Sequence, residues 1–178
     1  MIKKLLAEFP GDFAFSVSHT TRAPRAGEQN GVHYWFVTRP EFDALLKAGA
    51  FIESNEYNGN LYGTSHAAVE HVAAQGRTCL FDVDINGVVS FKTAKGFAQP
   101  PRYLFLSPPG DDPLAVLEQR LRGRGTESEE SLQRRLKQAQ AELRYRDIPH
   151  FFDRVIVNDD LATAYQEFRA FCTHKDAE

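Results

Sequence analysis

Apolar residues recur along the chain with two different periods, and each period predicts a different element. The apolar residues Ile2, Leu5, Leu6 and Phe9 have the spacing of one helix face. Residues 79–85 are almost continuously apolar, which is typical of a parallel strand covered on both faces. Shorter extended segments are predicted at 13–17, 34–37, 103–106 and 155–157, and another starts at 51. Strands that alternate with helices predict an α/β fold with a parallel sheet.

Helices are expected between these strands, and polar residues mark several of their starts. Counted with their capping residues, the later helices are predicted at 38–47, 65–76, 88–95, 114–122, 129–146 and 161–172. Thr38 and Glu41 form a capping-box sequence, and Ser65 can cap the next helix. Either Thr126 or Ser128 opens the segment 129–146. Trp35 and the many phenylalanines are expected in the core.

Composition narrows the class of protein. The 178 residues are 42% hydrophobic, enough for one compact core with small inserted lobes. The formal net charge of -3 gives no general reason to bind nucleic acid or a membrane surface, so any anion site must be local. Cys79 and Cys172 form neither a disulfide framework nor a metal motif. With no apolar run near the roughly 20 residues of a membrane span and no signal peptide, we expect a cytoplasmic monomer.

A polar loop with two arginines is the first candidate site. Arg22 and Arg25 are three residues apart and are separated by Pro24, which stiffens the loop. Each guanidinium offers a planar fork of donors that stays charged, which suits a dianionic phosphate. On spacing alone, a solvated surface loop is an equally good interpretation.

The wider sequence around this loop resembles the guanylate kinases. Residues 15–28 read Phe-Ser-Val-Ser-x-Thr-Thr-Arg-x-Pro-Arg-x-Gly-Glu, similar to the signature segment of that family. Collinear similarity continues through 51–53, 59–64 and 81–88. The resemblance implies that the whole chain is one guanylate kinase-like domain with the P-loop-kinase type of parallel sheet flanked by helices. It also implies an inserted GMP-binding lobe within residues 17–75 and an arginine lid within 120–135.

The resemblance assigns a set of residues to GMP. They are Ser18, Arg22, Arg25, Glu28, Tyr34, Glu53, Tyr62, Thr64, Asp82 and Asp84. A carboxylate at Glu53 can accept two parallel N–H bonds from guanine N1 and the 2-amino group, a pair that adenine does not offer. Thr64 stands where the family usually has serine. Asp82 and Asp84 would lie near GMP and the magnesium-bound phosphates, although capping of the following helix is an alternative.

The second half of the chain supplies the other implied residues. Arg120, Arg124 and Arg135 match the lid arginines in spacing, and with Arg25 they would neutralise charge on the transferred phosphoryl group. Without the resemblance, a solvated basic helix face is the ordinary interpretation. Asn158 and Asp159 follow the last strand, where the family contacts adenine; a helix cap is the alternative there.

The implied activity belongs to purine nucleotide metabolism: ATP and GMP give ADP and GDP, with Mg²⁺ and ATP as cofactor and co-substrate and no metal site built from protein side chains. The family holds ATP with a Gly-x-x-x-x-Gly-Lys-Ser/Thr loop, and no segment of the chain has that sequence. The segment from Ile2 to Glu8 resembles the helix that follows this loop. We therefore expect an N-terminal truncation in which the first central strand and the P-loop are absent. The alternative function is a non-catalytic GMP-binding or peptide-binding module.

Overall fold

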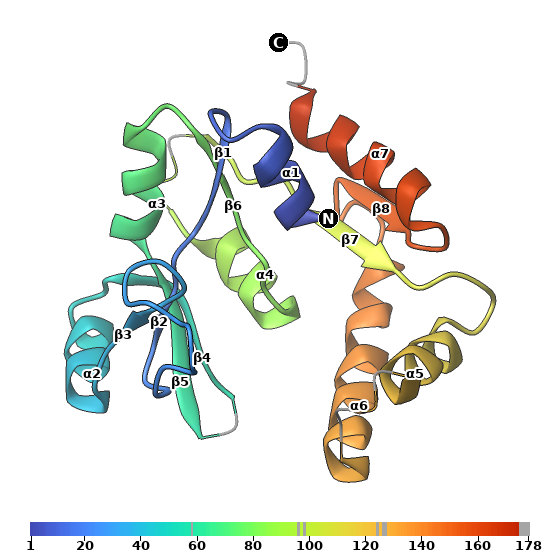
Figure 1. Cartoon of the computed structure of the whole chain (residues 1–178), viewed down its shortest axis with the longest axis horizontal. Helices are drawn as coiled ribbons and strands as arrows, with labels where there is room; N and C mark the ends of the chain where they lie inside the picture. The colour runs from blue at the N-terminus through green and yellow to red at the C-terminus, as the bar shows by residue number, and fades with distance from the viewer. Residues whose placement is uncertain (58, 96, 98, 124, 126–127, 175–178) are drawn as a thin grey trace. The chain divides into compact units, whose positions relative to one another are not determined.

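A computed structural model describes residues 1–57, 59–95, 97, 99–123, 125 and 128–174. The chain divides into two compact units (Figure 1). The N-terminal unit comprises Ile2–Gln99, and the C-terminal unit comprises Pro100–Glu178 together with Met1. Within the described ranges, no helix has the length and apolar character required to cross a membrane.

A parallel strand pair with its helices forms one part of the N-terminal unit. Its elements are α1 (Ile2–Glu8), β1 (Phe13–Phe15), α3 (His66–Ala74), β6 (Thr78–Leu80) and α4 (Ile85–Thr93). Strands β1 and β6 pair in parallel, with Phe13 opposite Thr78. Helix α1 contacts β1 and helix α3 contacts β6 (Figure 1). The fully buried Leu5 of α1 and the buried Phe13 anchor these contacts.

A four-stranded sheet forms the rest of that unit. Its strands are β2 (His19–Thr20), β3 (Trp35–Phe36), β4 (Phe51–Tyr57) and β5 (Asn60–Ser65), in the order β3-β2-β5-β4. The β4 and β5 strands form an antiparallel hairpin, β2 runs antiparallel to β5, and β3 runs parallel to β2. Helix α2 (Arg39–Lys47) buries Phe42 completely, and the Phe42 ring stacks on Phe51 with 4.4 Å between centroids.

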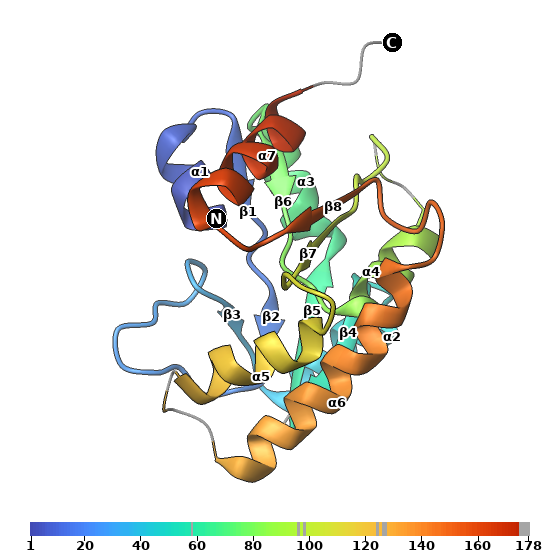
Figure 2. The ribbon, with the colours of Figure 1, turned by 90° about the vertical axis from the view of Figure 1, so that its right-hand side faces the viewer.

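The C-terminal unit contains a second parallel strand pair. Its elements are β7 (Leu104–Ser107), α5 (Pro113–Gly123), α6 (Glu129–Arg146), β8 (Arg154–Val157) and α7 (Leu161–Thr173). Strands β7 and β8 pair in parallel, and α7 packs against β8. Figure 2 shows α5 beside α6, where Leu121, Leu132 and Leu136 form a buried cluster. Apolar residues on one face of each helix therefore hold the two helices together.

The structure confirms most of the predicted elements and corrects two points, the length of one strand and the burial of Trp35. Helix α6 has the predicted bounds, and Thr38 and Glu41 make the predicted capping box at the start of α2. The predicted strand 79–85 was too long, because β6 ends at Leu80 and helix α4 begins at Ile85. Within the described residues, parallel pairing joins β1 to β6, β2 to β3 and β7 to β8. Trp35 was predicted in the core, but it is 43% exposed.

Candidate functional site

The loop after β2 holds an arginine and a glutamate in a bidentate ion pair. Arg22 donates from Nη1 to Glu28 Oε2 at 3.0 Å and from Nη2 to Glu28 Oε1 at 2.9 Å. The two side chains are only 15% and 17% exposed. The Arg22 hydrogen bonds, followed by that from the Arg25 backbone N–H at 2.7 Å, lower the pKa of Glu28 to about 2. Glu28 therefore stays ionised and orients the Arg22 fork.

Aromatic rings surround the same guanidinium. The Arg22 Cζ atom lies 5.4 Å from the Tyr34 ring centroid and 5.8 Å from that of Phe36. Tyr62 meets Tyr34 edge to face, with 6.1 Å between ring centroids. Hydrogen bonding to Glu28 is the largest cause that raises the pKa of Arg22, and a smaller contribution comes from Tyr62. Three of the predicted GMP residues, Arg22, Tyr34 and Tyr62, thus lie together around a fixed positive charge.

Backbone pairing fixes this loop on the sheet through residues that sequence reasoning missed. The Thr21 N–H donates to the Leu61 carbonyl at 3.0 Å, and the Leu61 N–H donates to Thr21 Oγ1 at 2.9 Å. Asn30 Oδ1 accepts from the Phe36 N–H at 2.8 Å. Thr21 lies in the segment that resembles the family, but the sequence pattern indicated no role for Thr21, Asn30 or Phe36, because each acts through a contact between separate strands or loops.

A second polar group lies on β4 and β5. The strand register places Glu53 opposite Thr64. Thr64 is 1% exposed and donates from Oγ1 to Glu53 Oε1 at 2.7 Å, and Ser18 Oγ lies 3.4 Å from the same hydroxyl. Burial raises the pKa of Glu53, the hydrogen bonds from Thr64 oppose that rise, and the charge of Asp84 adds to it. Among the described residues, the Thr64 hydroxyl bond is at Oε1, and Oε2 takes no hydrogen bond from a side chain.

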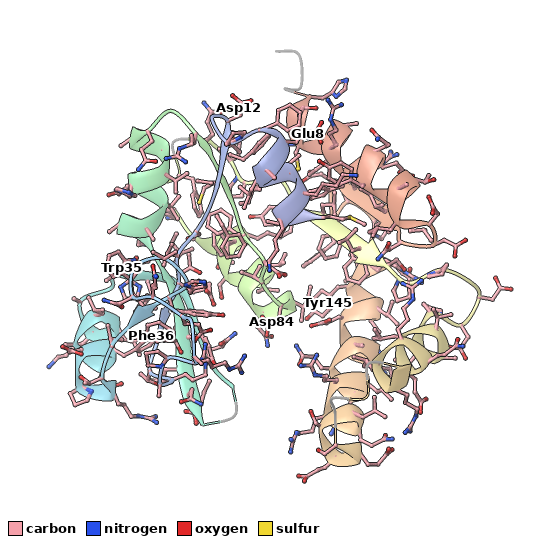
Figure 3. All side chains as sticks on the ribbon, in the orientation of Figure 1. Glu8, Asp12, Trp35, Phe36, Asp84 and Tyr145 are labelled. Atoms are coloured by element: carbon pink, nitrogen blue, oxygen red, sulfur yellow. The ribbon has the colours of Figure 1, made fainter. Side chains whose placement is uncertain are left out.

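The two aspartates after β6 have different environments. Asp84 caps helix α4, and its Oδ1 accepts from the Gly87 N–H at 2.9 Å (Figure 3). The capping alternative is therefore confirmed for Asp84. Asp82 is exposed, and within the described part of the chain no hydrogen bond or ion pair joins it to the other predicted GMP residues. The Arg25 side chain is exposed, and the Arg25 backbone N–H donates to the Glu28 carboxylate that pairs with Arg22.

The C-terminal unit joins one predicted lid arginine to the turn after β8. Arg120 donates from Nη2 to the Asn158 carbonyl at 2.9 Å. The capping alternative for Asn158 and Asp159 is wrong, because Asp160 caps α7 and accepts from the Thr163 N–H at 2.8 Å. Ser128 caps α6, on which Arg135 is exposed. Arg124 and Thr126 lie outside the described residues.

Comparisons with known proteins show which family the chain resembles. A family model described as guanylate kinase matches residues 1–175. A guanylate kinase of Homo sapiens is 50% identical over 169 residues, which cover 95% of this chain and 83% of that protein. A guanylate kinase of Schizosaccharomyces pombe is 44% identical over 172 residues, covering 97% and 82%.

A solved structure gives the same result for the fold. The crystal structure of guanylate kinase from Anaplasma phagocytophilum is similar with a TM-score of 0.68 at 28% identity, and the match covers 98% of this chain and 82% of that chain. Fold, site and similarity together define a protein of the nucleoside monophosphate kinase class. Within that class, the chain belongs to the guanylate kinase family.

Proposed function

We propose that the chain binds GMP and acts as a guanylate kinase, transferring the γ-phosphoryl group of ATP to GMP to give ADP and GDP. The observation that carries this proposal is that one strand, β5, connects the Glu53 carboxylate with the Arg22 guanidinium. Thr64 on β5 donates to Glu53, and Tyr62, two residues earlier on β5, lies beside the Arg22 guanidinium. A nucleotide with one guanine and one phosphate matches this pair of groups.

Each group selects its part of GMP by chemistry. Glu53 would accept hydrogen bonds from guanine N1 and the 2-amino group, whereas adenine presents an unprotonated N1 to the same carboxylate. Arg22 and Arg25 would bind the phosphate, with hydroxyl donors from Ser18 and Tyr34. Glu28 keeps the Arg22 fork in place, as its bidentate pair indicates.

The transfer itself needs charge neutralisation more than a base, because the attacking phosphate oxygen of GMP is already ionised. Arg25, Arg120, Arg124 and Arg135 would neutralise the transferring group, and Asn158 and Asp159 would contact adenine. Mg²⁺ would enter with the ATP phosphates and neutralise part of their charge. Carboxylate oxygens suit Mg²⁺, and of the two aspartates Asp82 is exposed while Asp84 has one oxygen engaged in the helix cap.

One feature favours a second candidate function, a GMP-binding module without phosphoryl transfer. The 178 residues contain no Gly-x-x-x-x-Gly-Lys-Ser/Thr sequence, and such a loop supplies the backbone N–H groups and the lysine that hold ATP phosphates in P-loop enzymes. Both candidates predict GMP binding, but only the first predicts turnover.

Calorimetric titration with GMP and AMP tests the shared part of both candidates. We expect a clear preference for GMP. Glu53→Gln should lower the GMP affinity roughly 10- to 150-fold, the equivalent of one charge-assisted hydrogen bond of about 1.5–3 kcal/mol, because the amide presents a donor to guanine. Glu56→Gln is the matched control on the same strand, since Glu56 is exposed and pairs with Arg39. Equal affinities for GMP and AMP would reject the base-recognition role.

Product analysis then separates the two candidates. The 178-residue chain is mixed with ATP, Mg²⁺ and GMP, and ADP and GDP are measured by chromatography. Equal amounts of ADP and GDP support the kinase. GMP binding without GDP formation supports the non-catalytic module, and the same assay with Glu53→Gln controls for a contaminating kinase.

A further inference from the structure

Two kinds of group hold the Arg22 guanidinium: hydrogen-bond acceptors and aromatic rings. Along the edge, Nη1 and Nη2 bond to Glu28, and Nη1 also donates to the Ala23 carbonyl at 2.8 Å. The Cζ atom also lies over the Tyr34 and Phe36 rings, within 6 Å of both ring centroids. The bidentate pair with the carboxylate and the neighbouring rings together restrict the movement of the guanidinium.

The short strand β3 places Phe36 in this position. Phe36 lies opposite Thr20 in the parallel pairing of β2 and β3, and the Val37 N–H donates to the Thr20 carbonyl at 3.0 Å. The Tyr34 and Phe36 rings lie near each other, with 5.8 Å between centroids. Successive side chains of extended backbone point to opposite faces, so Trp35, which lies between them in the sequence, points to the other face. Accordingly, Trp35 packs against Gly31 and His19 instead of Arg22.

We propose that Phe36 is a positioning residue for the GMP phosphate, acting through the Arg22 guanidinium. This inference rests on the proposed function. Phe36 has no polar group, so it cannot bond the phosphate itself. Its ring limits the orientations of Arg22 before the nucleotide binds, which reduces the entropy lost when Arg22 grips the phosphate. Loss of the ring should therefore weaken recognition of the phosphate and leave recognition of guanine unchanged.

The ratio of GMP affinity to guanosine affinity measures this effect, because guanosine has the base but no phosphate. Calorimetric titrations of both ligands are compared for the unmodified chain and for Phe36→Leu. We expect the GMP affinity to fall about three- to tenfold, the range of a partly desolvated cation–π contact, with guanosine affinity unchanged. Phe36→Tyr keeps the ring and should keep the ratio. Trp35→Leu, on the opposite face of the same strand, is the matched control and should keep it too.

A second background tests whether the effect passes through Arg22. Lysine has no planar fork to orient. In an Arg22→Lys chain, adding Phe36→Leu should therefore change the ratio by less than about twofold, the usual scatter of independent substitutions. An equally large drop in that background would overturn the proposal.

Other outcomes are equally decisive. If Phe36→Leu lowers GMP and guanosine affinity by the same factor, Phe36 has only a structural role and the proposal is overturned. If Phe36→Leu does not fold, Phe36→Met replaces it, because the flexible thioether fills the space without an aromatic face. An unmodified chain that does not distinguish GMP from AMP refutes the proposed function and this role together. A chain that distinguishes them but keeps its GMP to guanosine ratio in Phe36→Leu refutes the Phe36 role alone.

Discussion

Thr64 allows a sharp test of the guanine end of the site, because two substitutions separate its hydroxyl from its methyl group. Thr64→Val keeps the shape of the side chain and removes the hydroxyl that donates to Glu53 Oε1 at 2.7 Å. Thr64→Ser keeps the hydroxyl and removes only the methyl group. Because Thr64 is 1% exposed, water does not simply replace what is lost.

The structure predicts different costs for the two changes. A hydrogen bond to a charged group contributes about 1.5–3 kcal/mol, so Thr64→Val should lower the free energy of unfolding by about that amount. Removal of one buried methyl group costs about 1 kcal/mol. For a chain of this size, each kcal/mol corresponds to about 2–4 °C, so the melting temperature should fall by about 3–12 °C for Thr64→Val and by about 2–4 °C for Thr64→Ser.

Thermal unfolding followed by circular dichroism measures both values. The Thr64 hydroxyl stabilises the ionised form of Glu53, so the cost of Thr64→Val should shrink as the pH falls and Glu53 becomes protonated. Thr64→Ser should show no such pH dependence. The reasoning is refuted if Thr64→Val is as stable as Thr64→Ser, because the bond to Glu53 would then contribute nothing.

Two further predictions follow from the same unit. The ratio of GMP affinity to AMP affinity should fall as the pH drops and Glu53 becomes protonated. Because the pKa of Glu53 is raised, this fall should begin at a pH above 4.5, the usual pKa of glutamate. Calorimetric titrations at several pH values measure this ratio. GMP and AMP carry the same phosphate group, so protonation of the phosphate affects both affinities and cancels in the ratio. Gly63→Ala should destabilise the chain by about 1–3 kcal/mol in urea unfolding, since its Cβ would lie 2.9 Å from a ring carbon of Phe51. Gly11→Ala is the control, with nothing within 4 Å of the added Cβ, and an equal loss of stability in both variants would contradict the packing argument.

Elements held by local interactions could be predicted from the sequence. The periodic apolar positions of α6 and the capping box of Thr38 and Glu41 both depend on residues within a few positions of each other. The predicted strand 79–85 failed for a local reason as well. The Asp84 side chain satisfies the Gly87 N–H and starts a helix, and this capping bond outweighs the apolar run that favoured a strand.

The candidate site was predictable only where similarity to the family supplied its residues. Glu28 lies six residues from Arg22 in one loop, and their bidentate pair brings together two of the residues that the resemblance assigned to GMP. The role of Phe36 depends on which side chain of β3 faces Arg22, and a strand of two residues is too short to carry a periodic signal. The same alternation explains why Trp35 is exposed although its residue type favours burial.

Two glutamates of the site respond to acid in opposite directions, and this contrast follows from their surroundings. Glu28 accepts charge-assisted bonds, so its pKa falls to about 2, and its stabilising effect is complete above pH 4.5 and is lost as the pH falls toward 2. Glu53 is partly buried and has a raised pKa, so the folded state takes up its proton more readily than the unfolded chain does. Ionisation of Glu53 therefore lowers the free energy of unfolding near neutral pH. The carboxylate that would recognise guanine thus slightly destabilises the folded chain. Mild acid should thus remove base selectivity while Arg22 remains oriented for phosphate.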